Sequence, residues 1–128
     1  MFSTQLYEKG DVALLQCKGR IVHSDAAYQL RNAVAAQQWA HTVVLDLSRV
    51  EALEGGGLGM LAYLQRWSEN HGMDLKLFNP SSPVRQRVEQ ARPFCDLEFL
   101  SAKDLESLMH EDQSRAQSNA ETLCSFAA

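Results

Sequence analysis

The chain has 128 residues, of which 45% are hydrophobic and 22% are charged, a composition typical of one globular domain with an apolar core. Its formal net charge of −4 argues against the strongly basic surface of a nucleic-acid-binding protein. No segment approaches the roughly 20 apolar residues that span a bilayer, so we expect no membrane insertion. The N-terminus lacks the pattern of a signal peptide, and three widely spaced cysteines argue against a disulfide framework, which together favour a reducing cytoplasm.

The first half of the chain predicts a β-hairpin, a helix and a buried strand. Residues 6–9 and 12–18 have strand patterns on either side of a Lys9-Gly10-Asp11 turn. A helix should follow, capped by Ser24, because serine readily accepts a hydrogen bond from the first turn of a helix. Residues 43–47 are an almost entirely apolar run, typical of a strand that is covered on both faces.

The second half predicts three helices that alternate with two strands. The first helix begins near Gly57 and ends at His71-Gly72. Its inward stripe comprises Met60, Leu61, Leu64 and Trp67. Strands are expected over residues 75–78 and 97–100, and the remaining helices follow caps at Ser81-Ser82-Pro83 and at Ser101.

This order of elements predicts an α/β fold with a mostly parallel central sheet of four to five strands and four helices. We expect the domain to comprise residues 1–110. From residue 111 to 128 the chain is polar, which predicts a tail that is flexible or forms a short helical extension. Binding sites in such sheets gather at the carboxyl ends of strands, where the Gly55-Gly56-Gly57 triplet follows the strand predicted over residues 43–47.

A phosphate-binding loop is the first chemistry to test at this triplet. The sequence from Gly57 to Ala62 formally satisfies G-x-G-x-x-A between a strand and a helix. However, Gly57 falls at the start of the helix, where a dinucleotide fold would need the preceding turn, and no Lys-Ser/Thr pair follows. The pattern therefore favours a tight strand-to-helix connection over a nucleotide site.

Catalytic and metal-binding patterns are missing from the sequence. Cys95 has no histidine placed to activate it, and Ser48 is not part of a G-x-S-x-G motif. Glu51 and Glu54 are predicted to share one mobile loop, which does not suit a pair of acid–base carboxylates. The four histidines show no metal-ligand spacing with cysteine or carboxylate. We therefore predict a protein that is not an enzyme and that uses neither a cofactor nor a metal.

A binding surface remains as the best use of the glycine triplet. Three arginines on the helix after Ser81 scatter around it, which favours a solvated face over a phosphate site: Arg85, Arg87 and Arg92. Leu58 lies off the apolar stripe of its own helix, so it either plugs the helix end or contacts a partner. The free amides at the start of this helix suit a partner's backbone, carboxylate or phosphate.

The residues around the triplet also resemble a known family. VVLDLSRV at residues 43–50 and EGGGLG at residues 54–59 are similar to the STAS signature (sulfate transporter and anti-sigma factor antagonist), which reads vvlDlsgV followed by iDSSGLGvL. GRIV at residues 19–22 and DLKLFNP at residues 74–80 resemble further strand ends of the family. The resemblance extends over residues 6–109 and implies the β/α fold already indicated by the pattern of elements.

The resemblance also implies a switch that this chain lacks. In the bacterial antagonists, a partner kinase phosphorylates a serine at the start of this helix, which adds about −1.5 to −2 charges and changes which partner docks. Aligned to that motif, Glu54 takes the place of Asp, Gly55 and Gly56 replace the two serines, and Gly57 matches the family's glycine. The phosphoserine position is therefore Gly56, which has no hydroxyl. A second position that is often acidic in the family is Val22 here.

The resemblance thus predicts a regulatory protein-binding domain that docks a kinase-type anti-sigma factor, or a similar protein, without serine phosphorylation. The expected partner-binding residues are Glu54, Gly55, Gly56, Gly57, Leu58 and Arg66. An accessory STAS subunit of a transporter, lipid-trafficking or stress-signalling assembly fits the lost serines equally well, and a nucleotide sensor is a third interpretation. The sequence also leaves open a homodimer formed through an edge strand or the tail.

Overall fold

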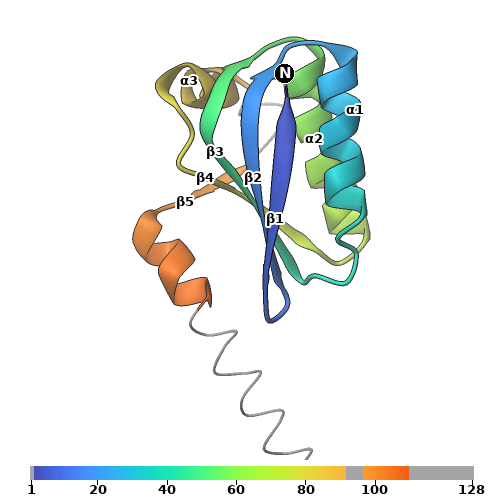
Figure 1. Cartoon of the computed structure of the whole chain (residues 1–128), viewed down its shortest axis with the longest axis vertical. Coiled ribbons are helices and arrows are strands. Elements are labelled where there is room, and N and C mark those ends of the chain that lie inside the picture. The colour runs from blue at the N-terminus through green and yellow to red at the C-terminus, as the bar shows by residue number, and fades with distance from the viewer. Residues whose placement is uncertain (1, 92–96, 110–128) are drawn as a thin grey trace, which may run out of the picture.

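The computed structural model describes residues 2–91 and 97–109. Strands and helices alternate after an initial β-hairpin, and a further helix covers residues 102–109 (Figure 1). The labelled elements are β1 (Ser3–Lys9), β2 (Val12–Ile21), α1 (Ser24–Ala35), β3 (Thr42–Leu53), α2 (Gly56–Asn70), β4 (Asp74–Phe78), α3 (Ser82–Gln90) and β5 (Glu98–Leu100).

The five strands form one sheet in the order β1-β2-β3-β4-β5. β1 pairs with β2 in an antiparallel direction, and every other neighbouring pair is parallel. α1 and α2 cover one side of the sheet, whereas α3 and the helix of residues 102–109 lie on the other side (Figure 1). The predicted α/β fold with a mostly parallel sheet and four helices is confirmed.

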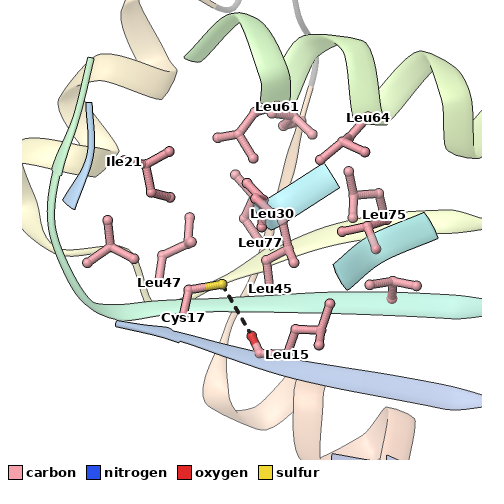
Figure 2. Close-up of a cluster of buried hydrophobic side chains, with 14 of the residues drawn as sticks. Leu15, Cys17, Ile21, Leu30, Leu45, Leu47, Leu61, Leu64, Leu75 and Leu77 are labelled. Atoms are coloured by element: carbon pink, nitrogen blue, oxygen red, sulfur yellow. Dashed lines mark hydrogen bonds between the residues drawn. The ribbon is translucent and has the colours of Figure 1, made fainter. Parts of the chain in front are cut away.

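The core lies between the sheet and the pair of helices α1 and α2. Leu15, Leu45 and Leu77 are aligned across β2, β3 and β4 and are almost completely buried. Leucines from α1 and α2 pack above this row (Figure 2), namely Leu30, Leu61 and Leu64. Burial of these apolar side chains is the main force that holds the two helices on the sheet.

Several element boundaries differ from the sequence prediction. β1 begins at Ser3, because pairing with β2 makes a strand of a polar segment that has no apolar pattern. β3 continues to Leu53, so Glu51 belongs to a strand, and the predicted mobile loop with Glu54 is wrong. The N-cap of α1 is His23, one residue before the predicted Ser24, and no side-chain cap hydrogen bond forms there.

Within the described ranges, no helix is both long enough and apolar enough to cross a membrane. Some features named in the sequence analysis lie outside the described residues, namely Arg92, Cys95 and the predicted tail over residues 111–128. The predicted cap at Ser101 is confirmed, since its hydroxyl oxygen accepts a hydrogen bond of 3.1 Å from the amide of Asp104.

Candidate functional site

The connection from β3 to α2 presents the glycine triplet at the carboxyl edge of the sheet. β3 ends at Leu53, which is buried, and the next three residues are exposed. Gly55 is the N-cap of α2 and has a φ of 52°, a backbone conformation that favours glycine. α2 then begins at Gly56, one residue earlier than predicted.

Gly57 is the member of the triplet that packing requires to be glycine. A Cβ atom at this position would lie 2.4 Å from the carbonyl oxygen of Ile21 and 3.0 Å from Cδ1 of Leu53. The first turn of α2 therefore packs directly against the end of β2. In contrast, a Cβ atom at Gly56 would meet nothing within 4 Å. The fold therefore accepts a side chain at Gly56, and packing does not require glycine there.

Hydrogen bonds fix the connection while leaving some of its amides free. The amide of Glu54 donates to the Ile21 carbonyl at 3.1 Å, and the amide of Gly57 donates to the Glu54 carbonyl at 3.0 Å. Among the described residues, the amides of Gly55, Gly56 and Leu58 have no hydrogen-bond acceptor. Because Gly55 and Gly56 are exposed, this helix start presents donors to solvent.

Leu58 and Arg66 occupy different parts of α2. Leu58 is half-buried and packs against the hydrophobic core, so its side chain partly closes the end of the helix. Arg66 is exposed ten positions after Gly56, which corresponds to about 15 Å along a helix axis. The structure therefore does not bring Arg66 next to the glycine triplet.

Arg87 is a neighbour of the site that the sequence did not reveal. Its Nη2 atom donates to Oε1 of Glu54 at 3.0 Å, which joins the β3–α2 connection to α3. The guanidinium of Arg85 instead lies 4.9 Å from the ring centroid of Phe99. These two arginines thus serve separate contacts. No local sequence pattern links Glu54 to a residue 33 positions later.

The carboxyl ends of β3 and β4 are linked by a hydrogen bond from the segment that follows β4. The helices that follow these strands lie on opposite sides of the sheet, an arrangement that often creates a ligand crevice. Here the Ser81 hydroxyl donates to the Val50 carbonyl at 2.8 Å, and the neighbouring Pro80 is buried. A separate cavity of about 470 Å³ borders the β2–α1 connection, where Val22 lies beside Arg20 and His23.

Cys17 is the cysteine that the structure describes, and its thiol is buried and unreactive at neutral pH. Cys17 is 1% exposed, and its thiol lies 3.7 Å from the Leu15 carbonyl (Figure 2). Burial, together with the nearby charge of Asp46, raises the pKa of Cys17 to about 12. The thiol is therefore protonated at neutral pH and is a poor nucleophile. Among residues 2–91 and 97–109, no three His, Cys, Asp or Glu side chains are grouped so that they could hold a metal ion.

The fold is similar to those of solved structures of anti-sigma factor antagonists and of an anion transporter. An antagonist from Mycobacterium paratuberculosis has 18% sequence identity and a TM-score of 0.69, over 86% of this chain and 95% of the other. SpoIIAA of Bacillus, in its phosphorylated form, has 19% identity and a TM-score of 0.62, over 83% and 96%. The anion transporter SLC26A9 has 17% identity and a TM-score of 0.64, over 84% of this chain but only 21% of the transporter.

At these identities, the structural matches establish the fold alone. No curated protein matches the sequence significantly. The model of the STAS domain matches residues 3–103, which include all five strands and the β3–α2 connection with its glycine triplet. By this match, and by the sheet and helices that carry it, the chain belongs to the STAS domain family.

Proposed function

We propose that this STAS domain is a non-catalytic regulator that binds a kinase-type anti-sigma factor, or a similar protein, through residues 54–66. In this proposal it acts in the bacterial cytoplasm on transcription and is not controlled by phosphorylation of the usual serine. The observation that carries the proposal is the environment of Gly56. This residue is exposed at the start of α2, has room for a side chain and offers no hydroxyl to a kinase.

The exposed amides of Gly55 and Gly56 supply the binding chemistry in this proposal. A partner's carboxylate or backbone carbonyl would accept hydrogen bonds from them, favoured by the positive end of the helix dipole. Glu54, held by Arg87, adds one negative charge at the rim of the same surface. Because no phosphate can form at Gly56, this surface stays in one charge state, and the domain would remain permanently competent to bind.

The proposal is tested with Gly56→Asp and Gly56→Asn as a matched pair. Both side chains have similar volume and fit the open space at this position, but only aspartate adds the negative charge of a phosphorylated serine. Aspartate in the first turn is also favourable for a helix, so lost binding would not reflect a damaged fold. We expect capture of a serine-kinase-type anti-sigma factor by the wild type and Gly56→Asn, and at least tenfold weaker capture by Gly56→Asp. Equal binding by all three proteins, or binding by none, refutes the proposal.

The alternative role is an accessory subunit of a larger assembly. The similarity to the fold of SLC26A9, in which the matched part is 21% of the chain, shows that this architecture also occurs within a transporter. Co-purification with membrane subunits or very large particles would favour this role, whereas a discrete one-to-one complex with a kinase-like protein would favour the antagonist. Calorimetric titration with GTP and ATP tests the nucleotide-sensor interpretation separately.

A further inference from the structure

β1 is a long sheet edge whose outer side is open. All seven of its residues pair with β2, from Ser3 opposite Lys18 to Lys9 opposite Val12. β1 is the first strand of the sheet order, so among the described residues its other side has no strand neighbour. Residues 3–8 are all exposed, including Leu6 at 37% and Tyr7 at 44%. No helix is drawn across β1 in Figure 1.

This edge lacks the features that usually prevent strand addition. Sheet edges are commonly protected by proline, by bulges, by short length or by charged side chains along the strand. β1 contains no proline, its register with β2 has no shift, and its only charged residues are the last two, Glu8 and Lys9. The opposite edge strand, β5, has only three residues. β1 is therefore the edge that is able to accept another strand.

A groove runs beside this edge on the α1 side of the sheet. It has a volume of about 480 Å³ and is lined by Phe2, Ser3 and Thr4 together with Gln29, Asn32 and Ala33 of α1. A strand added to β1 would direct alternate side chains toward this groove. Its amide side chains suit a polar or charged group on the incoming strand.

We propose that β1 pairs with β1 of a second copy in an antiparallel direction, about a two-fold axis at Leu6. This register overlaps all seven residues of both strands. Leu6 then faces Leu6 of the partner subunit, Gln5 faces the partner's Tyr7, and Thr4 faces the partner's Glu8. Such an interface is isologous, because the same surface of each copy contacts the other. The two sheets would join into one.

The side-chain directions support this register. Thr4, Leu6 and Glu8 pair with Cys17, Leu15 and Ala13, which belong to the core beneath α1, so these three side chains point to the α1 side. The partner's Glu8 would therefore approach the groove beside Thr4, where its carboxylate can accept hydrogen bonds from the amides of Gln29 and Asn32.

Charge also excludes one alternative register. Moving the axis to Glu8 would place two carboxylates opposite each other, which is destabilising. In the proposed register, each charged side chain of β1 lies opposite a hydroxyl-bearing residue, Thr4 or Ser3. A seven-residue strand pair is a small interface, so the dimer should be weak and dependent on concentration.

The first experiment measures self-association of the full chain by sedimentation equilibrium from about 10 µM to about 1 mM, the range suited to weak dimers. The wild type should dimerise. Leu6→Lys would bring two ammonium groups together at the axis and should weaken dimerisation at least tenfold. Tyr63→Lys makes the same replacement charge at a half-exposed residue of α2 and should leave dimerisation unchanged. Circular dichroism confirms that each variant is folded.

A second experiment tests the register by cross-linking with a mild oxidant, in a background carrying Cys17→Val, Cys95→Ser and Cys124→Ser. Leu6→Cys should cross-link with itself readily, since side chains directly opposite each other have Cβ atoms about 4.5–5.5 Å apart. Thr4→Cys should cross-link with itself slowly but should cross-link readily when mixed with Glu8→Cys. Cys17 is replaced as well, because it lies opposite Thr4 on β2 and would compete for a disulfide with Thr4→Cys inside one copy.

A monomer at every concentration overturns the proposal. So does a dimer that Leu6→Lys leaves intact, or Thr4→Cys cross-linking with itself as fast as Leu6→Cys does. If the β1 amides become protected from hydrogen exchange only when another protein's strand is added, the occupant of this edge is that partner and not a second copy. These outcomes are independent of Gly56 and its partner, so they leave the proposed function untouched.

Discussion

Replacing Gly57 with alanine tests the contact between α2 and β2 on which the candidate site is built. The added Cβ atom would lie 2.4 Å from the Ile21 carbonyl oxygen and 2.6 Å from its Cγ2 atom, whereas ordinary contacts are 3.4 Å or longer. The carbonyl belongs to the backbone and cannot rotate away. α2 would have to move by about 1 Å, and this shift would strain the hydrogen bond from Glu54 to the same oxygen.

The expected destabilisation follows from three contributions. Overpacking of a tight contact costs about 2 kcal/mol, and weakening of the hydrogen bond to Ile21 costs about 1 kcal/mol. The greater helix preference of alanine returns at most about 1 kcal/mol. Gly57→Ala should therefore lower the free energy of unfolding by about 2 kcal/mol, which corresponds to a fall in melting temperature of roughly 6 to 8 °C.

Gly56→Ala is the matched control for this prediction, because a Cβ atom there meets nothing within 4 Å. It should leave the free energy of unfolding unchanged or raise it by up to about 1 kcal/mol. Urea denaturation followed by circular dichroism measures both variants, with an unchanged slope as the check that the denatured state is the same. If Gly57→Ala proves as stable as Gly56→Ala, the packing argument is wrong.

Three further predictions concern buried and paired groups. Burial raises the pKa of Cys17 from 9.0 to about 12, so the folded state favours the protonated thiol. The contribution of this thiol to the free energy of unfolding is complete below pH 9 and is lost as the pH rises toward 12. Alkaline urea titrations should show a decline of up to about 1.4 kcal/mol per pH unit that Cys17→Val removes. Ser68 is 1% exposed and its hydroxyl has no partner among the described residues, so Ser68→Ala should stabilise the protein by about 1 kcal/mol in urea denaturation, and a loss of stability would contradict this. Glu54 and Arg87 are half-exposed, so a double-mutant cycle should give a coupling free energy of no more than about 1 kcal/mol that disappears in 1 M salt, whereas a salt-independent coupling would show that the pair is not solvent-screened.

The order of strands and helices was predictable because burial leaves a periodic pattern in the sequence. The buried strand of residues 43–47 and the apolar stripe of α2 are examples, and both appear in the structure. Prediction failed where a strand forms because it pairs with a neighbouring strand and not because its own sequence has an apolar pattern. The polar first half of β1 is a strand only because β2 lies beside it. The sequence predicts that β3 ends at Leu47, because Ser48 and Arg49 interrupt its apolar run. In the structure both residues are exposed, and the strand continues past them where its register with β2 shifts.

The candidate site was only partly predictable for the same physical reason. The triplet's position after a parallel strand follows from local sequence, and the family resemblance singled out Gly57. The contact that makes Gly57 necessary, with the carbonyl of Ile21, spans 36 positions and has no local signature. The ion pair between Glu54 and Arg87 is equally remote in sequence. Arg66 was assigned to the binding surface without knowledge of its distance along α2, and its contribution to that surface stays a prediction.

The three consecutive glycines have three separate physical roles. Gly55 adopts a positive φ that a side chain would strain, Gly57 allows α2 to touch β2, and Gly56 meets neither demand. Where neither the backbone conformation nor the packing requires glycine, another residue can take its place without altering the fold. A serine at Gly56 would therefore be accommodated at little cost in stability, and it would place a hydroxyl at an exposed helix start, where a phosphate is electrostatically favourable. In the proposed function, the presence or absence of a phosphorylation switch would therefore depend on this one side chain, while Gly57, Ile21 and the core beneath them maintain the helix start around it.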